Sequence, residues 1–151
     1  MLHPSFNRNL HRLINKIAWP FFLIEVHPER DCSCLDKQSN RGDPVCPYCL
    51  GTGHMIKIRK IMAVKQPYKA RNLDVTDLDV NFTTYFIDAK YAPIKLGDMV
   101  VLEDEVDVIK LVKIFCSDSG MPQYFECPAT YRRHGLNPFL KNFKHIVEDK
   151  S

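Results

Sequence analysis

Hydrophobic positions near the start of the chain recur with the period of an α-helix. Their spacing predicts a helix that Ser5 caps, that runs to about Trp19 and that ends at Pro20. Such an apolar face packs most simply on the protein's own core, and docking on a partner is the alternative. The apolar positions are Phe6, Leu10, Leu13, Ile14 and Ile17, and the opposite side carries Arg8, Arg12 and Lys16.

Beyond Pro20 the pattern changes to the alternation that is typical of β-strands. Phe21 to Val26 is short, aromatic and β-branched, and an alternation that begins at Met55 changes phase near Lys60, which predicts a β-bulge. The mixed spacing of residues 139–147 fits either a last strand or a short helix. Further strands are predicted from Val80 to Ala89, Met99 to Leu102, Val106 to Phe115 and Gln123 to Tyr131.

These elements predict a mainly β fold of the α+β class. We expect a small antiparallel barrel or curled sheet of about five or six strands, with an N-terminal helix and an inserted zinc-binding loop. The length of 151 residues suits one domain with a single insertion. We divide the chain into an N-terminal helix and first strand at 1–27, an inserted zinc-knuckle loop at 28–54, and a β-rich core with the C-terminal segment at 55–151.

The inserted loop contains four cysteines in the spacing of a metal site, a CxC pair followed by a CxxC pair. Two close pairs supply four thiolates to one tetrahedral zinc ion, and four sulfur ligands leave no open position for catalysis. Glycines follow the second pair, where a chain that turns around a metal needs positive φ angles. We expect one structural Zn²⁺ per chain, held by Cys32, Cys34, Cys46 and Cys49, with Gly51 and Gly53 forming the supporting turns.

Two other chemistries use part of the same loop. The four residues from Cys46 to Cys49 match the CPYC active site of glutaredoxins, but that chemistry needs its first thiol at a helix N-terminus, and Leu50 to Gly53 opposes a helix. His27-Pro28-Glu29 followed by CxxC has a superficial likeness to the zinc-deaminase signature, although the proline before the second motif is displaced. Both alternatives leave the CxC pair without a role, so we prefer the structural zinc site.

Other candidate residues have simpler structural interpretations. His27 or His54 can replace a cysteine as a ligand, although such a histidine is more often a surface residue. Cys116 and Cys127 flank a turn and can face each other across a hairpin, but small buried core residues are the simpler interpretation. The sequence has no Ser/His/Asp order, paired-carboxylate motif, phosphate-binding loop or dinucleotide fingerprint, so we expect no enzyme.

Charge and composition limit the function only broadly. The net charge of +3, from 21 basic and 18 acidic residues, is too small to indicate nucleic-acid binding by itself. Basic residues surround Tyr68, and Arg132-Arg133 follows Tyr131, so a zinc-ribbon nucleic-acid-binding protein remains an alternative. The longest apolar stretch, residues 17–26, is too short to span a bilayer and lacks a signal-peptide cleavage site. We expect no membrane partner and a reducing compartment, where clustered cysteines bind metals rather than form disulfides.

Two resemblances rest on these motifs. The segment from Cys46 to Gly53 resembles one CxxCxGxG unit in the zinc region of J-domain co-chaperones, which supports the knuckle geometry and not a chaperone function. More of the chain is similar to the small neck proteins of tailed bacteriophages, of the head-closure or stopper type. That similarity is carried by the short N-terminal helix, the CxC…CxxCxGxG loop, and the β-core segment Gly97-Asp98-Met99-Val100-Val101 followed by Val108 to Phe115.

The second resemblance implies a structural virion protein, assembled in the host cytoplasm, at the head–tail junction. Proteins of this type form homo-oligomeric rings, contact the portal or adaptor and the tail-completion proteins, seal the DNA-filled head and dock the tail. The resemblance implies no small-molecule substrate and no catalytic residue, and it carries over only the four cysteines as zinc ligands. The mild positive charge is compatible with non-specific contact with packaged DNA.

Overall fold

The computed structural model describes residues 4–66, 82–132 and 136–149, which form a β-barrel with two helices. Helix α1 (Pro4–Ile17) leads into a long antiparallel hairpin of β1 (Trp19–Asp31) and β2 (His54–Gln66). The later elements are β3 (Phe82–Asp88), the 3-10 helix η1 (Ala89–Tyr91), β4 (Met99–Leu102), β5 (Glu105–Ile109), β6 (Lys113–Cys116), β7 (Pro122–Tyr131) and α2 (Leu136–Asp149).

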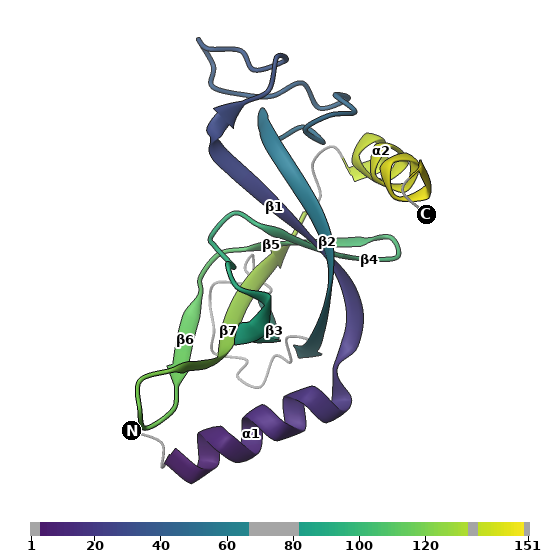
Figure 1. The fold of residues 1–151 in the computed structure, drawn as a ribbon. Helices are drawn as coiled ribbons and strands as arrows, with labels where there is room; N and C mark the ends of the chain where they lie inside the picture. Colours follow the sequence, from purple (N-terminus) through teal and green to yellow (C-terminus); the bar gives the residue numbers. More distant parts are fainter. Residues whose placement is uncertain (1–3, 67–81, 133–135, 150–151) are drawn as a thin grey trace, which may run out of the picture.

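Six of the described strands close into an antiparallel barrel in the order β3-β2-β1-β4-β5-β7, and pairing of β3 with β7 completes the circle. The expected mainly β fold with an N-terminal helix is therefore confirmed, and the sheet is a closed barrel (Figure 1). The described strands number seven because the single strand expected from Val106 to Phe115 is two strands, β5 and β6. The break lies opposite Pro128 of β7, which has no N–H to donate to a continuous ladder.

Two apolar cores lie on opposite faces of β1. Phe21 and Leu23 belong to the core inside the barrel, whereas the alternate residues Phe22 and Ile24 belong to a second core beneath α2. Phe22 packs edge-on against Phe143 of α2, with ring centroids 5.4 Å apart. The C-terminal segment is thus a helix, the second of the two expected alternatives, because its apolar residues cover the outer face of the barrel.

The same two cores explain the phase change along β2. The pairing of β1 with β2 runs without interruption past Lys60, and its irregularity lies between His27 and Asp31 of β1. The predicted bulge near Lys60 is therefore wrong. Ile56 and Ile58 pack on the core beneath α2, whereas Ile61 and Ala63 pack inside the barrel. One regular strand buries opposite faces at its two ends, which imitates the sequence pattern of a bulge.

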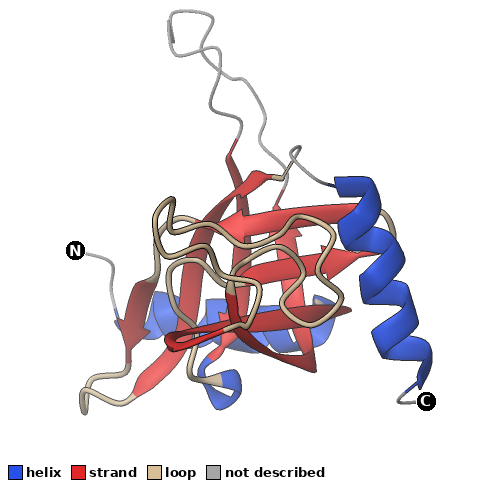
Figure 2. Ribbon diagram, turned by 90° about the horizontal axis from the view of Figure 1, so that it is seen from above, coloured by secondary structure: helices blue, strands red, loops and turns tan. Residues whose placement is uncertain are grey.

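The cysteine-containing loop and α1 lie at opposite ends of the molecule (Figure 1). We call residues 32–53, between β1 and β2, the knuckle. In Figure 2, the view from above, the loops of the knuckle lie in front of the barrel and α1 lies behind it. Helix α1 is held by buried Ile14 and by a hydrogen bond of 2.9 Å between Nε2 of His11 and a carboxylate oxygen of Asp88. Neither α1 nor α2 is long and apolar enough to cross a membrane.

Candidate metal centre

The knuckle brings its two cysteine pairs together because the ends of the hairpin meet at its base. The N–H of Cys32 donates to the carbonyl oxygen of Gly53 over 2.8 Å, so the first and last residues of the knuckle lie side by side. Within it, Asp36 and Arg41 form an isolated antiparallel bridge that folds the chain back on itself. The CxC pair therefore follows the end of β1, and the CxxC pair lies on a turn shortly before β2.

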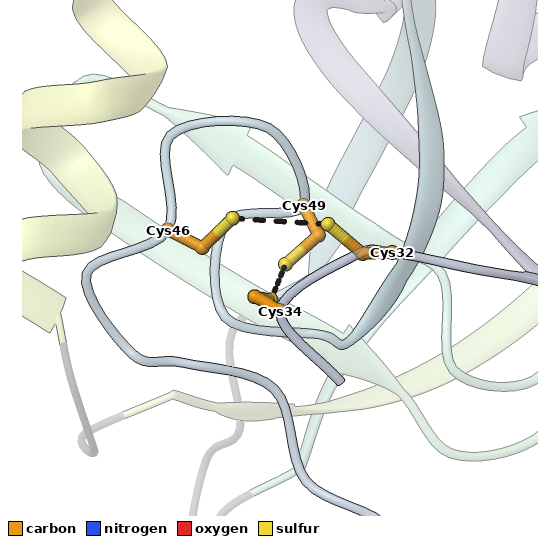
Figure 3. Close-up of side chains that lie close together, drawn as sticks. All are labelled: Cys32, Cys34, Cys46 and Cys49. Carbon is orange, nitrogen blue, oxygen red and sulfur yellow. Dashed lines mark hydrogen bonds between the residues drawn. The ribbon is translucent and has the colours of Figure 1, made fainter. Parts of the chain in front are cut away.

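The four predicted cysteines converge on one point. Their Sγ atoms all lie within 4.8 Å of one another, with 3.8 Å between Cys32 and Cys46 and 3.4 Å between Cys34 and Cys49 (Figure 3). These separations are far longer than a disulfide bond, and all four thiols are free. A tetrahedron with Zn–S bonds of about 2.3 Å has sulfur–sulfur edges of about 3.8 Å. The cluster therefore has the donor set and the size to bind a metal ion.

The backbone around the cluster favours thiolates over thiols. The N–H of Asp43 points to the sulfur of Cys34 over 3.5 Å, and the N–H of Gly53 points to that of Cys49 over 3.4 Å. Burial raises the pKa of Cys46, but the N–H groups of Cys49 and Tyr48, together with hydrogen bonds from the thiols of Cys34 and Cys49, outweigh it and lower this pKa to about 7. Such donors stabilise the sulfur charge that a bound cation requires.

Two of the other thiols, those of Cys34 and Cys49, hold their protons more tightly. Burial raises the pKa of Cys49. The N–H of Asp43 lowers the pKa of Cys34, but burial and hydrogen bonds with the other three thiols raise it to about 12. Without a cation, four thiolates this close would repel one another, so protons stay on the cluster. Metal binding replaces those protons and removes the repulsion.

Three glycines make the tight path of the knuckle possible. Gly51 and Gly53 have φ angles of +85° and +79°, the left-handed conformation expected for the turns after the second pair. A Cβ on Gly53 would also lie 2.7 Å from Cδ1 of Leu35. Gly42 is a glycine that sequence reasoning missed: its Cβ would lie 2.3 Å from the backbone nitrogen of Gly53. Its only sequence signal is its place in the turn-forming run Arg41-Gly42-Asp43-Pro44.

Arg132, just after β7, fastens the knuckle to the barrel. Its Nη2 donates to the carbonyl oxygen of Leu50 over 3.3 Å, and its guanidinium lies 4.5 Å from the ring centroid of Phe139 in α2. Burial lowers the pKa of Arg132, and the nearby Cys49 raises it. A second link joins α2 to the knuckle, because Asn142 donates to the carbonyl oxygen of Val45 over 3.2 Å. In the sequence, Arg132 stands out only as part of a basic pair with Arg133.

The other candidate residues lie apart from the four thiols. His27 is within 3.3 Å of Glu29, and His54 is within 3.3 Å of Asp31, so these histidines have acidic neighbours of their own. Among the described residues, the group of metal-binding geometry contains cysteines only. The residues from Cys46 to Gly53 form turns, so no helix N-terminus lies at Cys46.

Cys116 and Cys127 do not face each other across the β6–β7 hairpin. Cys116 is exposed and pairs with Pro122, whereas Cys127 is buried in the barrel core and pairs with Tyr85 of β3. Burial raises the pKa of Cys127 to about 12. The simpler interpretation, a small buried core residue, therefore describes Cys127 but not Cys116.

No known family matches the chain, and no curated protein matches its sequence.

Proposed function

We propose that this chain is a non-catalytic structural protein with one zinc ion in its knuckle, and that it acts as a neck or head-closure connector at the head–tail junction of a tailed bacteriophage. The observation that carries the proposal is the convergence of four cysteine thiols at the tip of a hairpin that extends from a closed barrel. Four sulfur ligands occupy every position of a tetrahedral metal ion, so the ion fixes the loop and leaves no open site for substrate.

Zinc is the metal that this donor set favours. Thiolate ligands select soft or borderline cations, and a compact tetrahedral group of four is typical of structural zinc. The knuckle has little core of its own, since its buried apolar cluster consists of the cysteines themselves. The free energy of metal binding would take the place of that missing core.

The zinc proposal is tested by native mass spectrometry of protein purified without chelator. We expect a mass excess of one zinc ion per chain that disappears on denaturation. Replacing zinc by Co²⁺ should give the absorption of a tetrahedral thiolate site. Cys46→Ser should lose the metal, and the exposed Cys116→Ser is the matched control that should keep it. A metal-free chain with four titratable thiols would contradict the proposal and require a test of Cys46 as a redox thiol.

Two structural features, the closed barrel and the loop at one end of it, support the proposed neck role. A closed barrel gives a stable body, and a metal-bound loop held by Arg132 and Asn142 gives a rigid contact element at one end. Both features would suit a ring subunit that lies between two layers of a virion. Deleting the gene from its phage should leave DNA-filled heads without tails, rescued by the wild type and by Cys116→Ser but not by Cys46→Ser. Normal tailed particles without the gene would contradict the proposal.

A second candidate, a nucleic-acid-binding protein, is favoured by two hollows beside the knuckle. One, of about 320 Å³, is lined by Arg41 and Arg132. The other, of about 430 Å³, also reaches Arg132 and adds Lys110 and Tyr131. None of the described residues that line them is acidic. If the chain binds nucleic acid, its affinity for labelled single-stranded DNA should fall steeply as the salt concentration rises. The affinity should also be lower in Arg41→Gln than in the wild type. Undetectable binding at low salt would contradict this second candidate.

A further inference from the structure

The two hollows beside the knuckle adjoin each other where the knuckle meets the barrel. Gly51, Thr52 and Arg132 line both of them, so the hollows lie on either side of these three residues. Their volumes of about 320 and 430 Å³ are those of ligand pockets rather than of surface dimples. Together they form one cleft with two lobes, which we call the knuckle cleft.

The two lobes differ in their chemistry. The smaller lobe is polar and basic, because Arg41 and Arg132 line it and Asn40 adds a carboxamide. The larger lobe has Lys110 in its lining and adds apolar and aromatic side chains from the barrel. These side chains are Val26, Met99, Val108 and the half-exposed Tyr131. A ligand that fills both lobes therefore needs an anionic group and an apolar or aromatic group.

Arg132 is held in a fixed position between the lobes. Its guanidinium lies 4.5 Å from the ring centroid of Phe139, and Nη2 donates to the carbonyl oxygen of Leu50. Nη1 donates to the sulfur of Met99 over 3.3 Å. A thioether is a weak acceptor, and a phosphate oxygen accepts the same kind of donor far more strongly. A guanidinium that is already positioned loses little conformational freedom when it binds such an oxyanion.

The other two cations of the cleft come from different segments. The backbone of Arg41 is fixed by the isolated bridge within the knuckle, and the N–H of Lys110 donates to the carbonyl oxygen of Pro128. Both side chains are exposed, so they are accessible to an incoming anion. Negative charge on the nearby Cys49 offsets part of the charge of Arg132. Arg41 and Lys110 therefore supply much of the attraction for an anion.

Acidic side chains do not cancel this attraction. None of the described residues in the lining of the cleft is acidic. The acidic residues that precede or follow a lining residue in the sequence each have a partner of their own. Asp43 accepts from the N–H of Val45, and the partners of Glu25, Asp98 and Asp107 are Arg59, Lys95 and Tyr85.

We propose that the knuckle cleft binds a phosphate ester. Its phosphate group lies in the smaller lobe beside Arg41 and Arg132, and its organic group lies in the larger lobe beside Tyr131. A nucleotide has this chemistry, either as a free molecule or as part of a strand. The proposal does not depend on the neck role, and it assigns a small-ligand site where the second candidate function requires only a strand.

The test is a titration of the full chain, as purified with its metal, followed by amide NMR spectra at constant ionic strength. The probes are deoxyadenosine monophosphate, inorganic phosphate and deoxyadenosine. The monophosphate should shift the amide signals of Gly42, Gly51 and Thr52 until they saturate. It should bind about tenfold or more tightly than either of the other probes, because it alone fills both lobes. No saturable shift, or equal binding of the monophosphate and phosphate, would overturn the proposal and leave an adventitious ion only.

Substitutions in each lobe locate the ligand. Arg41→Gln and Lys110→Gln should each weaken binding of the monophosphate about threefold or more, because each removes a cation. Lys37→Gln is the matched control, since Lys37 is an exposed lysine of the knuckle that lines neither hollow. Arg132 is left unchanged because it also fastens the knuckle. Equal weakening in Lys37→Gln and Arg41→Gln would overturn the proposal.

Tyr131→Ala tests the larger lobe by itself. It should weaken binding of the monophosphate but leave binding of inorganic phosphate within about twofold of the wild type, because stacking on an aromatic ring is lost and the phosphate contacts remain. Equal weakening for both probes would show that the organic group does not lie beside Tyr131, and it would overturn the two-lobed arrangement.

Competition with a single-stranded deoxyadenosine oligonucleotide distinguishes the two sources of the ester. Displacement of the bound monophosphate by the strand supports both the site and the second candidate function. A strand that does not compete, with the monophosphate still bound, supports a site for a free ester and contradicts the second candidate function. A strand that binds equally to the wild type, Arg41→Gln and Lys110→Gln would place nucleic acid elsewhere and overturn the knuckle cleft as its site.

Discussion

The Nη2 atom of Arg132 lies 3.3 Å from the carbonyl oxygen of Leu50, although the two residues are far apart in the sequence. Leu50 directly follows Cys49, the last cysteine of the knuckle, and has a φ angle of +54°. Its carbonyl group therefore marks the point where the knuckle turns back toward β2. The same guanidinium stacks on Phe139 of α2. One side chain therefore joins the barrel, the knuckle and the C-terminal helix, and its charge lies close to Cys49 of the cysteine cluster.

Replacing Arg132 should loosen the knuckle without removing a metal ligand. We expect Arg132→Gln to lower the free energy of unfolding by about 1–3 kcal/mol, because a stacked cation and hydrogen bonds to buried groups are lost. Zinc should also leave faster in a chelator competition assay. Arg132→Lys keeps the charge but not the planar fork, so it should recover only part of both effects. Arg41→Gln, at an exposed residue, is the control, and an equal effect there would contradict the role of Arg132.

Loss of a single thiol should remove the metal and much of the stability of the chain. Cys49→Ser is expected to purify without zinc, to aggregate, and to melt about 10 °C or more below the wild type, because several kcal/mol of binding free energy are lost. Cys49 is fully buried, whereas Cys116 is exposed on β6, so Cys116→Ser should melt as the wild type does. Differential scanning fluorimetry with zinc analysis of the same samples measures both. If Cys49→Ser melted at the same temperature as the wild type, the metal site would be dispensable for stability.

The cluster of cysteines was predictable from the sequence because its four members lie close together along the chain. The CxC and CxxC pairs and the glycines after them lie within one short segment, and their chemistry limits what they can form. The contacts that position the knuckle were not predictable, since Arg132 and Asn142 lie far along the chain. Only the closure of the barrel and the docking of α2 bring them to the loop.

The fold class was predictable for a similar reason, and its details were not. Alternation along the strands and turn residues between them indicated a small antiparallel barrel. The break between β5 and β6 depends on Pro128, a residue of the neighbouring strand, and no pattern within the broken segment marks it. The phase change near Lys60 depends on two cores on opposite faces of one sheet. Both are consequences of tertiary structure.

The glycines of the knuckle can be tested against a matched glycine elsewhere. Gly53 and Gly120 have φ angles of +79° and +81°, but only Gly53 has neighbours that a Cβ would meet. Gly120→Ala should cost about 1 kcal/mol from backbone strain alone, measured by urea unfolding. Gly53→Ala should cost more, and it should also weaken zinc binding, because its Cβ would lie 2.7 Å from Leu35. Equal costs at both positions would show that the close packing of the knuckle is unimportant.

A substitution at Gly42 tests the effect of steric crowding without the effect of backbone strain. Its φ angle lies outside the left-handed region, but its Cβ would lie 2.3 Å from the backbone nitrogen of Gly53. We expect Gly42→Ala to shift the base of the knuckle and to weaken zinc binding in the chelator competition assay. The site of crowding is backbone, so no side-chain rotation relieves it. Unchanged zinc affinity in Gly42→Ala would contradict this view of the base.

A buried tyrosine hydroxyl in the barrel should limit the stability of the protein at alkaline pH. The hydroxyl of Tyr85 donates to the carboxylate of Asp107, and both side chains are buried. Burial raises the pKa of Tyr85 first, and the negative charge of Asp107 raises it further. A group whose pKa is raised by folding contributes stability that is fully present below its ordinary pKa of about 10 and is lost as the pH rises above it.

We therefore expect the free energy of unfolding of the wild type to fall above about pH 10, where the unfolded chain releases this proton and the folded chain keeps it. Tyr85→Phe should be about 1–3 kcal/mol less stable at neutral pH, because it leaves Asp107 without its buried donor. The variant should also lose less stability between neutral pH and pH 11 than the wild type does. Tyr131→Phe, at a half-exposed tyrosine, is the control. Parallel pH profiles for the wild type and Tyr85→Phe in urea unfolding would show that the Tyr85–Asp107 pair does not carry the alkaline transition.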